Sequence, residues 1–176
     1  PQMEVKMVQI GNFHIGRYDS AHKPVLSTGE ANSLWENLVA RYDWDDTLEL
    51  FVNFAYDQEL VSLLKKYQTL LREQAKTLEA RLAFYQVPLP NRSKKSISLE
   101  ANSGVVKDEF IFRRFFTGVQ ELLVLCSTAI KISVVSESLR TLFIDFISEQ
   151  AEEFDKLCKF GKKKGWLQIP PPKKIN

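Results

Sequence analysis

The chain has 176 residues, enough for one domain with a sizeable core and too short to predict two. Apolar residues make up 44% of it and charged residues 26%, as in an ordinary globular protein. The formal net charge of +2 excludes a strong long-range field towards nucleic acid. Two cysteines, Cys126 and Cys158, are too few for a disulfide framework and indicate reduced thiols in a cytoplasmic setting.

The first 26 residues carry no helical pattern, and we expect an N-terminal arm there. Met3, Val5 and Met7 alternate with charged residues, which favours a short extended piece, before glycines and a proline interrupt the run. No secretory signal pattern is visible. The arm is expected to lie over the rest of the chain through three apolar side chains, Phe13, Ile15 and Tyr18.

Residues 27–176 are predicted to form one helical domain with helices at about 28–55, 58–86, 106–133 and 137–164. Ser27 and Glu30 form a capping box at the first helix, and Asp57 and Ser136 are suitable caps for the second and fourth. In the second helix, apolar residues recur every three or four positions between charged ones, which predicts an amphipathic helix. The third is apolar nearly all round, which indicates a central helix or a second face for another subunit. Charged residues within it argue against a membrane span.

The two halves of this domain resemble each other when the chain is shifted by about 80 residues. Leu60, Leu64 and Tyr67 then fall on apolar positions of the fourth helix, although chance similarity between amphipathic helices remains an alternative. Two hairpins of this kind would pair into an all-α, up-down-up-down four-helix bundle. That topology would bring the ends of the second and fourth helices together and gather basic residues at one pole: Arg92, Lys94, Lys95, Lys162, Lys163, Lys164, Lys173 and Lys174.

No motif of known catalytic chemistry appears in the sequence. It lacks a nucleophile elbow, a phosphate loop and the Glu-x-x-His pairs of carboxylate-bridged metal bundles, and both histidines, His14 and His22, lie outside the predicted helices. We therefore predict a protein that is not an enzyme and that has no cofactor, no metal site and no nucleic-acid partner.

Four polar residues are candidates for burial in the bundle: Gln74, Gln150, Glu153 and Glu49. Gln74 interrupts the apolar face of the second helix, and the repeat places Glu153 opposite it. Such a layer more often fixes the register of a bundle than carries chemistry, so we expect a structural hydrogen bond there.

Several short motifs suggest a family: Glu30-x-x-x-Leu34-Trp35, Asp57-x-Glu59-Leu60, Asp108-Glu109-Phe110 and Lys164-Gly165-Trp166-Leu167. Together with the proline-rich exit at 87–90, they resemble the spore-coat-F-like, ferritin-like proteins of endospore-forming bacteria, a largely uncharacterised family of proteins described as spore coat components. The resemblance covers roughly residues 26–172. It implies a ferritin-like four-helix bundle and no catalytic residue.

The expected function is that of a non-enzymatic structural or interaction protein associated with the spore coat during sporulation. Its expected partners are other coat proteins or further copies of itself, joined through the helix at 106–133 into a homo-oligomer. The alternative is a ferritin-like protein that binds a metal through carboxylates, or a small ligand, in the bundle interior.

Overall fold

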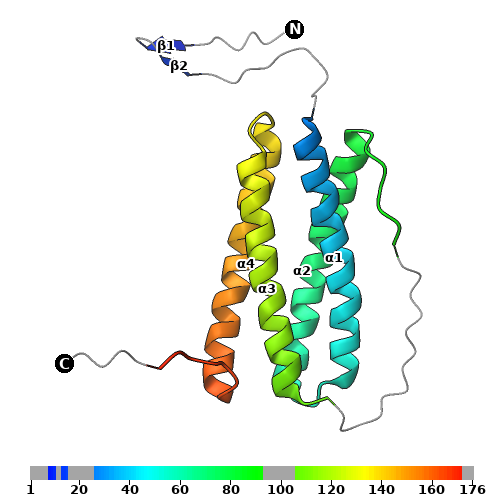
Figure 1. Ribbon diagram of the computed structural model, residues 1–176, viewed down its shortest axis with the longest axis vertical. Coiled ribbons are helices and arrows are strands. Elements are labelled where there is room, and N and C mark those ends of the chain that lie inside the picture. The colour runs from blue at the N-terminus through cyan, green and yellow to red at the C-terminus, as the bar shows by residue number, and fades with distance from the viewer. Residues whose placement is uncertain (1–7, 11–12, 16–25, 93–105, 172–176) are drawn as a thin grey trace, which may run out of the picture.

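The computed structural model describes residues 8–10, 13–15, 26–92 and 106–171. Four long helices pack side by side as an all-α bundle, α1 (Thr28–Phe54), α2 (Gln58–Phe84), α3 (Asp108–Ile132) and α4 (Glu137–Lys164) (Figure 1). Each begins and ends within two residues of its predicted range. The predicted four-helix bundle of two hairpins is therefore confirmed.

Two short strands precede the bundle. β1 (Val8–Ile10) pairs antiparallel with β2 (Phe13–Ile15), with Gln9 opposite His14. The extended piece predicted at Met3–Met7 and the predicted anchor Tyr18 lie outside the described residues. The other two predicted anchors, Phe13 and Ile15, are the ends of β2, of which the structure describes the backbone alone.

The predicted capping residues begin and end the helices. The Ser27 hydroxyl accepts from the Glu30 amide, while the Glu30 carboxylate accepts from the Ser27 amide in return. At α2 the Asp57 carboxylate accepts from the amides of Glu59 and Leu60, and at α4 the Ser136 hydroxyl accepts from the amide of Leu139. Gly165 closes α4 in the left-handed conformation at φ 70°. Local sequence therefore fixes where these helices start and stop.

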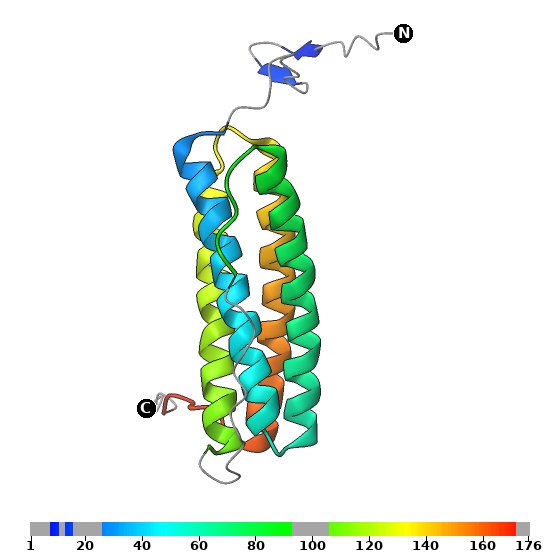
Figure 2. The same cartoon turned by 90° about the vertical axis from the view of Figure 1, so that its right-hand side faces the viewer.

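The predicted up-down-up-down order is wrong, because α2 and α3 run in the same direction. Hydrogen bonds place the start of α1 beside the start of α4, where Glu30 accepts from Ser136, and the start of α3 beside the α1–α2 turn, where Asp108 accepts from Asp57. The segment that leaves α2 runs back along α1 (Figure 2), and Arg92 on it reaches Asp45 midway along that helix. The chain between Phe84 and Asp108 is long enough to return along the whole bundle, so it does not force α2 and α3 to be antiparallel.

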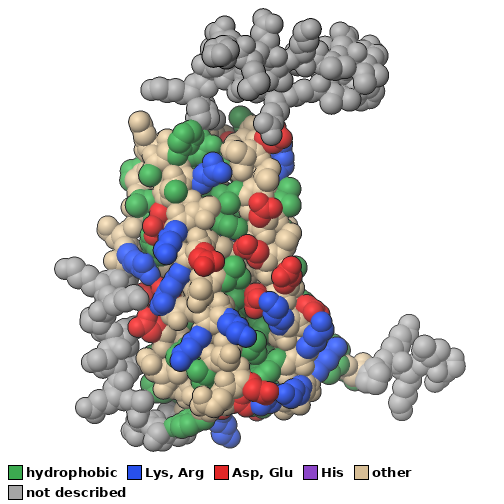
Figure 3. Space-filling view, turned by 180° about the vertical axis from the view of Figure 1, so that it is seen from behind, with side chains coloured by type: hydrophobic (Ala, Val, Ile, Leu, Met, Phe, Trp, Pro, Cys, Tyr) green, Lys and Arg blue, Asp and Glu red, His purple; other side chains and the backbone are tan. Residues whose placement is uncertain are grey.

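The predicted basic pole is consequently wrong, since α2 and α4 end at opposite poles. Lys163 and Lys164 lie at the α1–α2 turn, where they pair with Glu59 and Asp57. Arg92 lies midway along the bundle, and four of the other lysines fall outside the described residues: Lys94, Lys95, Lys173 and Lys174. Side chains of both charges are interspersed over the face seen in Figure 3.

In each hairpin, an acidic residue near the start of the first helix accepts hydrogen bonds from the interhelical turn of the other hairpin. The Glu30 carboxylate accepts from the amides of Val135 and Ser136 in the α3–α4 turn. The Asp108 carboxylate accepts from the amides of Tyr56 and Asp57 in the α1–α2 turn. Glu30 and Asp108 therefore occupy equivalent positions in the two hairpins and make equivalent hydrogen bonds, which supports the internal repeat.

The helix α3 is long and apolar enough, by composition alone, to cross a membrane, and it is the one such helix in the described parts of the chain. The core helix of a soluble protein can meet the same test. The inner side of α3 packs into the bundle, where Phe112, Phe115, Val119 and Leu122 are almost completely buried. Its exposed residues include the charged Arg113, Arg114, Glu121 and Lys131 together with apolar Phe110 and Val124.

Gly118 allows α1 and α3 to approach closely. A Cβ atom at this position would lie 2.1 Å from Cζ2 of Trp44, far inside van der Waals contact. The tryptophan ring is therefore seated against the bare backbone of α3.

We expect Gly118→Ala to lower the free energy of unfolding by about 2 kcal/mol, because overpacking outweighs the gain of ~1 kcal/mol in helix propensity. Denaturant unfolding of this variant beside Thr128→Ala, at an exposed site on the same helix, measures the effect. A Gly118→Ala variant as stable as the parent would show that the Trp44 ring can move aside to accommodate the added methyl group.

Candidate functional site

The centre of the bundle contains a positively charged side chain, Arg41 of α1, which has no exposed surface. Its Nη1 donates to Oδ1 of Asn37 at 2.8 Å, one helical turn earlier, and its Nε donates to Oε1 of Gln74 on α2 at 3.2 Å. Its Nη2 donates to Sγ of Cys126 on α3 at 3.2 Å. The guanidinium group thus connects three helices.

The fourth helix joins through two amide side chains. Gln150 of α4 donates from Nε2 to the same Oε1 of Gln74 at 3.2 Å and accepts from the Tyr67 hydroxyl. Gln74 donates from Nε2 to Oε2 of Glu149 at 2.6 Å. We call the buried members the Arg41 network: Asn37, Arg41, Tyr67, Gln74, Cys126 and Gln150.

No carboxylate touches the Arg41 guanidinium among the hydrogen bonds and ion pairs of the described residues. Its charge is balanced by amide and carbonyl oxygens, by the Cys126 sulfur and by the Phe146 ring, whose centroid lies 5.4 Å from Cζ. Glu149 is reached only through Gln74. Moving an ion out of water costs several kcal/mol, so these contacts are essential to the charge's stability.

The network is fully hydrogen-bonded in the described parts of the chain, where no buried side-chain nitrogen or oxygen lacks a partner. Burial raises the pKa of Tyr67 far above its usual range, although the charge of Arg41 opposes the shift. The Tyr67 hydroxyl therefore remains protonated and continues to donate to Gln150. A satisfied network of this kind favours a single arrangement of the four helices.

Two of the four candidate residues are in this network. Gln74 is 2% exposed and Gln150 is fully buried, and they bond to each other directly. Glu153 does not face Gln74 as predicted, since its side chain is 15% exposed and pairs with Lys156. The carboxylate on Gln74 is that of Glu149, one helical turn before Glu153.

The prediction that Glu49 is buried is wrong. Its side chain is 50% exposed and lies 3.5 Å from Arg72. The buried acid on this side of α1 is Asp45, four residues earlier, which is only 3% exposed and pairs with both Arg72 and Arg92.

Sequence reasoning missed Arg41, Asn37 and Cys126 as parts of a site. The helical spacing contained a signal, because Arg41 falls between Leu34, Leu38 and Leu48 on the buried face of α1. Arg41 was not predicted to be buried, because the long aliphatic part of an arginine on an apolar face usually places its guanidinium in solvent. Here the partner amides come from other helices, which one helix's pattern does not reveal.

Solved structures with a similar fold include a protein of Bacillus halodurans C-125 described as a "putative spore coat protein". It is 26% identical, covers 86% of this chain and 96% of its own, and has a TM-score of 0.78. Mycobacterium tuberculosis bacterioferritin is 15% identical, with a TM-score of 0.61 over 80% of this chain and 90% of its own. These likenesses confirm a ferritin-like fold.

A third similar structure is a two-domain protein of Anabaena variabilis ATCC 29413 that contains a ferritin-like domain. It is 14% identical, with a TM-score of 0.63 over 85% of this chain, and the match spans 41% of that longer protein. No curated protein matches this chain significantly in sequence.

The ferritin-like fold raises the question of whether the interior could hold a metal pair. Carboxylate-bridged sites are built from inward Glu and His side chains on all four helices. Here the inward side chains are amides, a tyrosine, a cysteine and the cationic Arg41, and Gln74 meets a single carboxylate. No group of three or more His, Cys, Asp or Glu side chains gathers in the described parts of the chain. These residues do not fit a metal pair, because a buried guanidinium repels cations.

The model of a family described as "Protein of unknown function (DUF3231)" matches residues 18–175, which is nearly the whole chain. The chain belongs to the DUF3231 family.

Proposed function

We propose that this protein is a non-enzymatic structural component of the spore coat, which acts by packing its helical bundle against protein partners. The observation that carries the proposal is the Arg41 network, which fills the bundle centre with hydrogen-bonded side chains that do not fit a metal pair. The likeness to the Bacillus halodurans protein, at 26% identity over 96% of that chain, supports the coat assignment.

Exposed apolar side chains supply surfaces for such packing. Phe84 at the end of α2 is 63% exposed, and Val134 and Val135 in the α3–α4 turn are 76% and 70% exposed. These residues lie near the same end of the bundle, where Tyr85 approaches Ser138 within 3.5 Å. We call Phe84, Val134 and Val135 the apolar end. On α3, the helix predicted to mediate oligomers, Val124 is 66% exposed among polar neighbours.

Sedimentation of the full chain at micromolar concentration, with pulldown from sporulating cells, tests the proposal. We expect self-association or capture of coat proteins, with Val134→Asp reducing it at least tenfold and Val124→Asp leaving it unchanged. If Val124→Asp reduced the association and Val134→Asp did not, the interface would lie on α3 instead. A strict monomer that captures no coat protein would contradict the proposal.

A further inference from the structure

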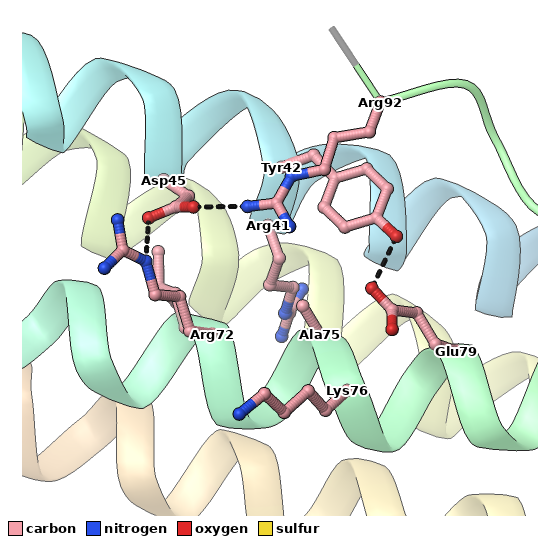
Figure 4. A pocket seen from close by; sticks show the side chains of 9 residues that line it. Arg41, Tyr42, Asp45, Arg72, Ala75, Lys76, Glu79 and Arg92 are labelled. Carbon is pink, nitrogen blue, oxygen red and sulfur yellow. Dashed lines mark hydrogen bonds and ion pairs between the residues drawn. The ribbon is translucent and has the colours of Figure 1, made fainter. Parts of the chain in front are cut away.

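A pocket of about 290 Å³ lies between α1 and α2, beside the Arg41 network and outside any role described above. Its walls are side chains of both helices, and Arg92 from the segment that runs back along α1 covers one side (Figure 4). The volume is near the lower end of the range for small-molecule sites. It is sufficient for a small organic or inorganic ion.

The charges around this pocket are unequal. Four cationic side chains line it, from Arg41, Arg72, Lys76 and Arg92, against the two acids Asp45 and Glu79. The lining therefore has an excess of positive charge, in a recess where water screens less than at an open surface.

Both acids already have partners within the wall. The Asp45 carboxylate receives Nε of Arg72 and Nη2 of Arg92, each at 2.6 Å, and is almost completely buried. The Glu79 carboxylate accepts from the Tyr42 hydroxyl at 2.6 Å. Burial and the contact with Glu79 raise the pKa of Tyr42 to about 12, so this hydroxyl remains a donor at neutral pH.

The cations are placed to receive a negatively charged group. Cζ of Arg92 lies 5.0 Å from the centroid of the Tyr42 ring, and this contact holds the guanidinium at the pocket wall. Lys76 is exposed, and its ammonium makes no hydrogen bond or ion pair with the described residues. The pocket thus combines positioned guanidinium groups with an ammonium that forms no ion pair in the described parts of the chain.

We propose that this pocket binds a small anion whose carboxylate or phosphate group is recognised by Arg72, Lys76 and Arg92. Ligand binding here would also hold Arg92, and with it the returning segment, against α1. The proposal is independent of the coat assignment, since it concerns a side pocket rather than the exposed apolar surfaces.

Titration of the full chain by isothermal calorimetry, with inorganic phosphate and separately with succinate at constant ionic strength, tests the proposal. We expect saturable binding of at least one of the two anions, and the stronger one identifies the group that is recognised. Lys76→Gln should weaken this binding at least tenfold. Lys66→Gln removes the same charge from an exposed position elsewhere on α2, and it should change the affinity for the anion less than twofold.

Two results would overturn the proposal. One is no saturable binding of either anion to the parent protein. The other is equal weakening by Lys76→Gln and Lys66→Gln, which would show a general effect of net charge. Circular dichroism of both variants confirms the helical fold, and because both sites are exposed, folding is expected to be unaffected.

Discussion

Gln74→Leu is expected to lower the free energy of unfolding by about 3 kcal/mol, although leucine is a better apolar filler than glutamine. The substitution removes the oxygen that accepts from both Arg41 and Gln150, and it leaves a buried guanidinium with fewer acceptors. Denaturant unfolding followed by tryptophan fluorescence measures the loss.

Removing the charge itself should be far less damaging. Arg41→Met is expected to change stability by less than about 1 kcal/mol, since the cost of burying the ion disappears together with its hydrogen bonds. Gln74 retains Gln150 as a donor in that variant. In a double-mutant cycle, Arg41→Met should recover most of the loss caused by Gln74→Leu. Additive losses in the double variant would show that the two side chains are not coupled.

Glu30→Gln is the second substitution with a large expected effect, a loss of about 3 kcal/mol at pH 7. Glu30 is fully buried and accepts from the amides of Ser27, Val135 and Ser136 as well as from the Ser27 hydroxyl. A glutamine would present an NH₂ group to these donors. The α3–α4 turn would then lose its attachment to α1.

The pH dependence follows from the same contacts. Burial alone would raise the pKa of Glu30, but the donors from Ser136, Ser27 and Val135 together lower it below the ordinary value of 4.5. Because the folded pKa is the lower one, the stabilisation is complete above pH 4.5 and is lost as the pH falls through the folded pKa.

The stability difference between the parent and Glu30→Gln should therefore narrow when unfolding is measured at pH 3 instead of pH 7. Glu152→Gln, at an exposed position on α4, serves as the control and should match the parent at both values. A difference that stays constant between pH 7 and pH 3 would contradict the assignment of an ionised, buried Glu30.

Much of the fold could be predicted because its signals are local. The capping residues Ser27, Asp57 and Ser136 and the closing Gly165 define helix ends within a few residues of sequence. The three-four spacing of apolar residues identified the buried faces of α2 and α4. Gln74 was recognised for the same reason, as a polar residue on such a face.

The direction of α3 could not be predicted, because helical periodicity says which face is buried and not which way the helix points. That direction depends on distant contacts, such as Arg92 with Asp45 and Asp108 with the α1–α2 turn. The partner of Gln74 was missed for a related reason. The repeat assumed a symmetric bundle, whereas the positions equivalent to Arg41 in the second hairpin, Gln120 and Glu121, are not basic, so the network is asymmetric.

We infer that the buried Arg41 guanidinium supplies the positive charge at the centre of this ferritin-like bundle in place of a metal ion. Elemental analysis of the purified full chain, after incubation with Fe²⁺ or Mn²⁺ and removal of unbound metal, tests it most directly. The structure predicts far less than one metal ion per chain. A stoichiometric transition metal that is lost on Glu149→Gln or Glu153→Gln would contradict the claim and favour a metal-carboxylate protein.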